Sequence, residues 1–172
     1  GDQVRLGPYL GTYYYVFKIN EAPWDNVKLR HAVSMAIDRN HLAEKVWQNT
    51  MIPAYSFVPP GIGGFETRTT DYAEKDQLDR EDEAKKVLTE LGYGPDKPLK
   101  MDIHYNTSEN HKNTAVAIQE QLKPLGIEVT LMKWRWVHGI EQLHWIGNVQ
   151  FQGNSGCFGG HTLASRLSLA AD

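Results

Sequence analysis

The sequence has almost no cysteine, since Cys157 is the only one in 172 residues. An intrachain disulfide is therefore impossible, and cysteine usage does not identify the compartment. A single thiol without a neighbouring base is more often a small packed apolar group than a nucleophile. With 41% hydrophobic residues, a chain of this length can bury a sizeable core without a disulfide or a metal.

Basic charge is not in excess either. Lys and Arg total 18 against 21 Asp and Glu, which gives a formal net charge of -3. A protein that neutralises a phosphate backbone needs a basic surface, so we expect no nucleic acid partner. Apolar runs are far shorter than the ~20 residues that span a bilayer, and the first residues lack the basic-then-apolar layout of a secretory signal. We expect either a mature chain or a piece of a longer one.

Familiar catalytic and metal-binding motifs are missing as well. None of the seven histidines belongs to an H-x-x-x-H pair and no C-x-x-C occurs, so the sequence has no zinc signature. The glycines of residues 61–64 lack the Lys-Ser/Thr ending of a phosphate-binding loop, and no G-x-S-x-G motif marks a nucleophile. We therefore expect no cofactor and no enzymatic activity. An α/β hydrolase, the alternative from another class, would need a nucleophile with a base in reach.

Regular secondary-structure patterns begin with residues 12–20, TYYYVFKIN. This run is rich in aromatic and β-branched residues and contains no Gly or Pro, so it predicts a strand. Pro23 and the Asp25-Asn26 pair then predict a turn and a helix N-cap. Apolar residues at helical spacing over 29–37 predict an amphipathic helix with Lys28, Arg30 and His31 near its rim. A second short helix is expected at about 41–48.

The rest of the chain alternates between helical and strand periodicity after a Pro- and Gly-rich loop. The patterns predict a loop at 53–70, helices at 79–91, 107–125 and 136–145, and strands at 99–106 and 127–131. Strands interleaved with covering helices predict an α/β fold, with a mixed sheet flanked by helices and right-handed crossovers.

Aromatic residues are the best candidates for a binding surface. Together they could line a groove that grips apolar side chains: Tyr13, Tyr14, Tyr15, Phe17, Trp47, Trp134 and Trp136. In a strand, Tyr13 and Tyr15 share one face and Tyr14 takes the other. The alternative is that alternate tyrosines of one strand are simply core, and periodicity does not decide which face meets a ligand.

Four stretches, in order, resemble one known family. They are VRLGPYLGTYYYVFKIN, APWDNVKLRHAVSMAIDRN, IPAYSFVPPGIGGF and DEAKKVLTELGYGPDKPLKMDIHYNTSENHKNTAVAIQEQLKPLGIEVTLMKW. Over residues 2–136 they resemble the third domain of the periplasmic oligopeptide-binding proteins of peptide ABC importers, extracellular solute-binding protein family 5. The resemblance implies one lobe of a periplasmic solute-binding protein at residues 2–145, followed by a divergent, glycine-interrupted tail at 146–172.

The resemblance also implies a ligand and partners. In the family a short peptide is enclosed between a first domain and this one, held by strand-like hydrogen bonds and wet pockets. Domain closure then presents a shape to the ABC permease in the membrane. We expect the first and second domains to be missing here, which leaves half a cleft. His111, in NTSENHK, matches a family histidine near the peptide's carboxyl end; the alternative is a solvated first-turn residue.

The tail departs from the family at a main ligand contact. After a Gly147-Asn148 turn the family runs into Gly-Trp-x-x-Asp-Tyr, whose aspartate meets the peptide's ammonium, but here Gly156 and Gly159 stand at the tryptophan and aspartate positions. Cys157 falls between them, which makes it a further candidate for the peptide site. An unpaired buried ammonium typically costs about 3–5 kcal/mol. A truncated or frame-shifted end is our hypothesis, and sequencing the encoding DNA would test it.

Three interpretations stay open at this point. The chain is a lobe of an oligopeptide receptor, or of a receptor for another solute such as a dipeptide, a murein peptide, haem or nickel. The third is a folded fragment that binds nothing on its own.

Overall fold

The computed structural model describes residues 10–133 in full and the backbone of residues 146–150 and 166–169. The elements are β1 (Gly11–Tyr15), α1 (Val27–Ala36), α2 (Arg39–His41), the π-helical turn η1 (Leu42–Val46), β2 (Ile52–Pro53), α3 (Gln77–Glu90), β3 (Leu99–Tyr105), α4 (Glu109–Leu122), the 3-10 turn η2 (Lys123–Leu125), β4 (Ile127–Lys133), β5 (Ile146–Gln150) and β6 (Arg166–Leu169). Within these residues, no helix combines the length and apolar character needed to cross a bilayer. The predicted helix at 136–145 lies outside the described residues.

The strands divide between two sheets. One has the order β2-β6-β1-β5, with β5 antiparallel and β6 parallel to β1, and the other pairs β3 with β4 in parallel through α4. The α/β class is confirmed, but the strands do not all share one sheet, because pairing between distant strands depends on tertiary packing that periodicity does not record. The predicted Gly147-Asn148 turn is wrong, since both residues lie in β5 opposite Tyr14 and Tyr13.

Helix starts follow the sequence signals closely. The side chain of Asn26 accepts hydrogen bonds from the backbone N–H groups of Lys28 and Leu29 at 3.0 and 3.3 Å, as an N-cap should. The second predicted helix begins slightly early, at α2, and its last turn is the π-helical η1. The first strand ends at Tyr15 instead of continuing to residue 20, because Phe17 leaves the sheet to stack on Trp24 at 5.1 Å.

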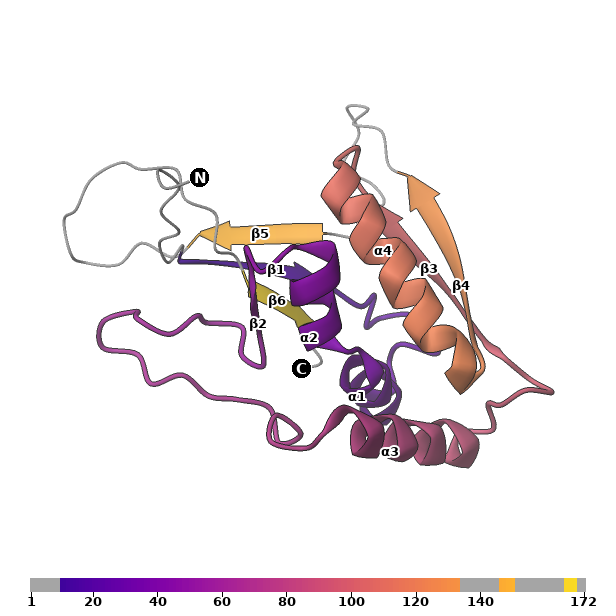
Figure 1. The fold of residues 1–172 in the computed structure, drawn as a ribbon. Helices are drawn as coiled ribbons and strands as arrows, with labels where there is room; N and C mark the ends of the chain where they lie inside the picture. Colours follow the sequence, from indigo (N-terminus) through magenta and orange to yellow (C-terminus); the bar gives the residue numbers. More distant parts are fainter. Residues whose placement is uncertain (1–9, 134–145, 151–165, 170–172) are drawn as a thin grey trace.

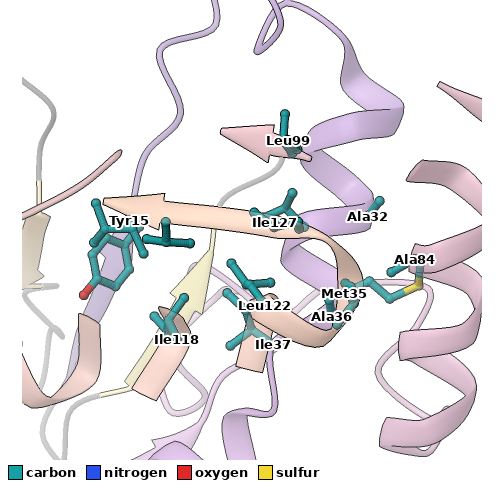
Figure 2. Packing of buried hydrophobic residues seen from close by; sticks show 14 of the residues in the cluster. Tyr15, Ala32, Met35, Ala36, Ile37, Ala84, Leu99, Ile118, Leu122 and Ile127 are labelled. Carbon is teal, nitrogen blue, oxygen red and sulfur yellow. The ribbon is translucent and has the colours of Figure 1, made fainter. Parts of the chain in front are cut away.

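One apolar core joins the helices to both sheets. Figure 1 shows α4 lying across β3 and β4, while α1 packs against α3. In Figure 2 the side chain of Met35 on α1 extends toward Ala84 on α3, and Ile37, Ile118 and Leu122 gather between α1 and α4. Burial of such side chains stabilises the fold by roughly 1.5–3 kcal/mol each.

Three arginines are buried in or beside this core, which the sequence patterns did not predict. Arg30, Arg39 and Arg80 are 5%, 1% and 2% exposed, so the prediction that Arg30 lies at a helix rim is wrong. Nη1 of Arg30 donates to the carbonyl of Trp24 at 2.8 Å. Backbone carbonyls and tyrosine hydroxyls accept hydrogen bonds from the guanidinium groups of the other two, which makes their burial tolerable.

Candidate functional site

Strand β1 carries the first two residues of the site on its inner face. Tyr13 and Tyr15 are 2% and 9% exposed, while Tyr14 on the opposite face is partly exposed and packs edge-on against Phe57. The rings of Tyr13 and Tyr15 meet edge to face at 5.5 Å, and the hydroxyl of Tyr13 donates to that of Tyr15 at 3.1 Å. The predicted division of the three tyrosines between two faces of the strand agrees with this geometry.

Trp47 adds an indole ring from the end of the turn η1. Its ring centroid lies 5.8 Å from that of Tyr13, and its side chain is half-buried. The indole N–H donates to Oγ1 of Thr114 on α4 at 2.9 Å. Trp47 thereby fills the space between β1 and the amino end of α4.

His111 supplies the polar group of the site from the first turn of α4. Its ring lies 4.6 Å from that of Tyr13 and 6.2 Å from that of Trp47, centroid to centroid. Nδ1 lies 2.7 Å from Oδ1 of Asn106, and the same oxygen accepts the backbone N–H of Ser108 at 3.0 Å. Because that amide atom already accepts a backbone N–H, it is the oxygen, and the proton of the neutral imidazole sits on Nδ1. Nε2 is then an acceptor.

Burial governs the protonation of this cluster. Desolvation raises the pKa of Tyr15 to about 12. The pKa of Tyr13 is raised well above its ordinary value, by burial first and then by Tyr15. Burial likewise lowers the pKa of His111, because an apolar surrounding disfavours the imidazolium. At neutral pH the cluster therefore consists of uncharged rings.

The structure brings together four of the five residues predicted for the peptide site, namely Tyr13, Tyr15, Trp47 and His111. The fifth, Cys157, lies outside the described residues. Sequence reasoning missed Asn106 and Thr114, which hold the histidine and the indole. Asn106 is the last residue of the strand predicted at 99–106 and directly follows β3 in the structure. Polar residues at strand ends are a usable signal for such a role.

Tyr15 also lines a pocket of about 400 Å³, whose walls do not include Tyr13, Trp47 or His111. Its walls include Phe17, Trp24 and Ile103, and charged side chains such as Lys18 and Asp102 stand around it. The pocket offers apolar surface for a side chain, whereas the His111 cluster offers a hydrogen-bonding group. In the part of the chain that the structure describes, no three His, Cys, Asp or Glu side chains gather as a metal site requires.

Comparison with known proteins shows the family to which this chain is similar. The model of bacterial extracellular solute-binding proteins, family 5 Middle, matches residues 1–155. The periplasmic oligopeptide-binding protein OppA of Salmonella typhimurium is 38% identical over 144 residues, which cover 83% of this chain and 26% of that protein. The periplasmic murein peptide-binding protein MppA of Escherichia coli is 40% identical over 135 residues, covering 78% and 25%.

Solved structures agree with the sequence comparisons. The unliganded open form of the murein tripeptide-binding protein MppA superposes with a TM-score of 0.73 at 40% identity, over 78% of this chain and 26% of that one. Haemophilus influenzae OppA in complex with RPPGFSPFR gives a TM-score of 0.68 at 36% identity, over 74% and 26%.

The chain spans about a quarter of the length of the curated relatives that it matches. The matched segment covers most of this chain, runs in one piece and includes every described residue of the His111 cluster. The chain therefore belongs to the bacterial extracellular solute-binding proteins of family 5.

Proposed function

We propose that this chain forms one wall of the peptide cleft in an oligopeptide-binding receptor that supplies an ABC importer from the periplasm. The observation that supports it best is the His111 cluster, in which a partly exposed imidazole contacts the buried ring of Tyr13 and the half-buried ring of Trp47, within a family whose named relatives bind peptides. Rigid aromatic surface next to a single polar group suits apolar side chains and a chain terminus. The task is transport, with no catalytic step.

Within the cluster the roles divide by exposure. His111 and Trp47 are partly exposed and can meet a ligand. Tyr13 and Tyr15 are buried behind them and hold the two rings in place. His111 lies near the peptide's carboxyl end in this proposal. Cys157 stays a proposed neighbour of the peptide at its ammonium end.

The protonation state of His111 shapes how it would bind a carboxyl end. A neutral ring with its proton on Nδ1 presents an acceptor at Nε2, which suits a peptide N–H. A direct bond to a carboxylate requires that His111 take up a proton or that a water bridge the two groups. Peptide binding through this residue should therefore strengthen as the pH falls through the titration of His111.

The other wall of the cleft would come from the first and second domains of a longer receptor, and the ABC permease would recognise the closed form. This part of the proposal draws on the relatives, of which the chain covers about a quarter. A peptide enclosed between two walls buries most of its solvent-accessible surface against protein, whereas a single wall cannot bury as much.

A murein peptide is the second candidate ligand, because MppA at 40% identity is as similar to this chain as OppA at 38%. Receptors for dipeptides, haem or nickel, and a folded segment with no binding of its own, are further alternatives. The residues of the complete cleft would decide among these solutes.

Calorimetry on two proteins tests the proposal. The first is the 172-residue chain alone, titrated with a mixed pool of tri- to pentapeptides. The second is Salmonella OppA whose matching segment is replaced by residues 10–133 of this chain. We expect no saturable heat from the chain alone and micromolar binding, about -8 kcal/mol, by the chimera. A folded chimera that binds no peptide, or clear binding by the isolated chain, would contradict the proposal.

The chimera also distinguishes among the candidate ligands. Murein tripeptide and unmodified oligopeptides are titrated in parallel, with haem and Ni²⁺ as non-peptide solutes. Preference for haem or Ni²⁺ over both peptides would overturn the peptide assignment.

A further inference from the structure

We propose that Trp47 is a positioning residue, which holds His111 in its ligand-facing place through a hydrogen bond to Thr114. The inference deepens the proposed function, because it assumes that His111 meets the ligand. The sequence predicts Trp47 as an aromatic contact for a ligand, but its indole N–H donates to a side chain inside the protein.

The backbone that presents Trp47 is unusual on both sides. It follows the π-helical turn η1, and the next two residues, Gln48 and Asn49, have φ values of 50° and 59°. π-helical turns are rare and occur often at functional sites. Non-glycine residues in the left-handed region are strained and persist where surrounding contacts enforce them. Here the N–H of Asn49 donates to the carbonyl of Ala43 at 2.8 Å.

A chain of hydrogen bonds leads from the indole to the residue before His111. Nε1 of Trp47 donates to Oγ1 of Thr114 at 2.9 Å, and that hydroxyl donates to the carbonyl of Asn110 at 2.8 Å. Thr114 is fully buried, so neither bond competes with water. The indole thus fixes the first two turns of α4 relative to η1.

Ring contacts complete the support. The rings of His111, Tyr13 and Trp47 form a triangle, with the His111 centroid 4.6 Å from that of Tyr13 and 6.2 Å from that of Trp47, while Asn106 holds Nδ1 of the imidazole. Tyr13 is the titratable group that faces the imidazole from β1, and Glu109 and Lys112 flank it on α4, where they pair with each other at 3.2 Å. Without the Trp47 bond, α4 could shift, the imidazole could turn away from Asn106, and water could reach both ring nitrogens.

Histidine ring NMR on the intact chain provides the test. Thr114→Val removes the acceptor but keeps the shape, Thr114→Ser retains a hydroxyl, and Trp47→Phe keeps a ring without the donor. Thr89→Val is the matched control, since its hydroxyl donates to the carbonyl of Lys85 on the exposed side of α3. The ¹⁵N shifts of His111 report its tautomer, and their titration reports its pKa.

In Thr114→Val and Trp47→Phe we expect the pKa of His111 to rise by at least about half a unit and the Nδ1–H tautomer to lose its dominance, because water stabilises the imidazolium. Thr114→Ser should keep the pKa and the dominant tautomer of His111 as they are in the original chain, and Thr89→Val should leave both unchanged. A lower melting temperature with an unaltered His111 titration would reduce Trp47 to a structural residue and overturn the inference. If Thr114→Val does not fold, Trp47→Phe and Thr114→Ser decide the question by the same signals.

Measuring peptide binding by the same variants of the chimera distinguishes a failure of this inference from a failure of the proposed function. If the His111 signals move as expected while peptide affinity stays the same, the positioning role of Trp47 stands and the ligand role of His111 fails. If neither the signals nor the affinity change, the positioning role fails alone.

Discussion

The guanidinium of Arg39 lies 5.1 Å from the centroid of the Tyr55 ring, and the guanidinium of Arg80 lies 5.2 Å from the same ring. Arg80 also donates to the Tyr55 hydroxyl at 2.6 Å. Tyr55 stands at the start of the long segment between β2 and α3, and its carbonyl accepts the N–H of Thr70 near the end of that segment at 2.8 Å. The two guanidinium groups and one backbone hydrogen bond therefore hold Tyr55 in place at the start of this segment.

Replacing Tyr55 should measure the strength of that arrangement. Tyr55→Phe removes the acceptor of a buried guanidinium N–H, and we expect the free energy of unfolding in urea to fall by about 1.5–3 kcal/mol. Tyr55→Leu also removes the ring beneath both cations and should cost about 1–2 kcal/mol more. Tyr93→Phe, at a partly exposed ring 5.9 Å from Lys97, is the control and should stay within about 0.5 kcal/mol. Equal losses in Tyr55→Phe and the control would contradict the assigned role.

The sequence predicted the locally encoded parts of this fold. The N-cap predicted in the Asp25-Asn26 pair, the helix that follows it and the alternating strand predicted at 99–106 all depend on short-range patterns. The structure has them as the Asn26 cap, α1 and β3. The buried arginines were not predictable, because periodicity assigns charged residues to the surface. Arg39 is tolerated inside because the nearby carbonyl of Ser34 and the distant hydroxyl of Tyr72 accept hydrogen bonds from its guanidinium.

High pH should weaken the fold through the buried tyrosine pair. The pKa of Tyr15 is raised to about 12 in the folded chain, so unfolding releases a phenol that ionises near 10. Between these values the unfolded state binds fewer protons, and the free energy of unfolding falls by about 2–3 kcal/mol as the pH rises from 10 to 12. Urea unfolding at pH 8, 10 and 11.5 measures this loss. Tyr15→Phe should show a shallower decline, whereas parallel declines would refute the prediction.

Mild acid should weaken the fold through His111. Its pKa is lowered in the folded chain, so the unfolded chain takes up a proton at a higher pH than the folded one does. The stabilisation is complete above the ordinary histidine pKa of ~6.5 and is lost as the pH falls from there toward the lowered value. His111→Gln should flatten that part of the stability profile, measured by urea unfolding between pH 7.5 and 5. An unchanged slope in this variant would count against a half-buried, neutral imidazole.

Tyr13, Tyr15, Trp47 and His111 were named as candidates from the sequence, but their arrangement in space was not predicted. Alternation placed Tyr13 and Tyr15 on one face of β1, and the family resemblance singled out His111. Contact among Tyr13, Trp47 and His111 joins three elements far apart in the chain, and it depends on where η1 and α4 pack. No local pattern contains that information, so the supporting bond from Trp47 to Thr114 became visible only in three dimensions.

Two helix starts offer a matched test of capping. Asn26 caps α1 with two hydrogen bonds, whereas Ser108 occupies the same position before α4 without a side-chain bond. Asn26→Ala should therefore lower the free energy of unfolding by about 1 kcal/mol. Ser108→Ala should change it by less than about 0.5 kcal/mol. Equal losses, measured by urea unfolding at neutral pH, would mean that the hydrogen bonds of the Asn26 side chain contribute nothing.

Close backbone packing at Gly126 should make this glycine harder to replace than Gly92. Both have positive φ, 78° and 81°, so alanine at either position should cost about 1 kcal/mol from backbone strain. A Cβ at Gly126 would also lie 3.2 Å from the carbonyl carbon of Gly94, whereas one at Gly92 would meet nothing within 4 Å. The carbonyl of Gly126 accepts the N–H of Leu99 at 3.1 Å, so a shift there also disturbs the start of β3.

Gly126→Ala should consequently lose at least about 1 kcal/mol more than Gly92→Ala in urea unfolding, because displaced backbone adds to the strain. If the two variants lose the same free energy, the contact between Gly126 and Gly94 is loose enough to admit a methyl group, and the β3–β4 pair does not depend on it.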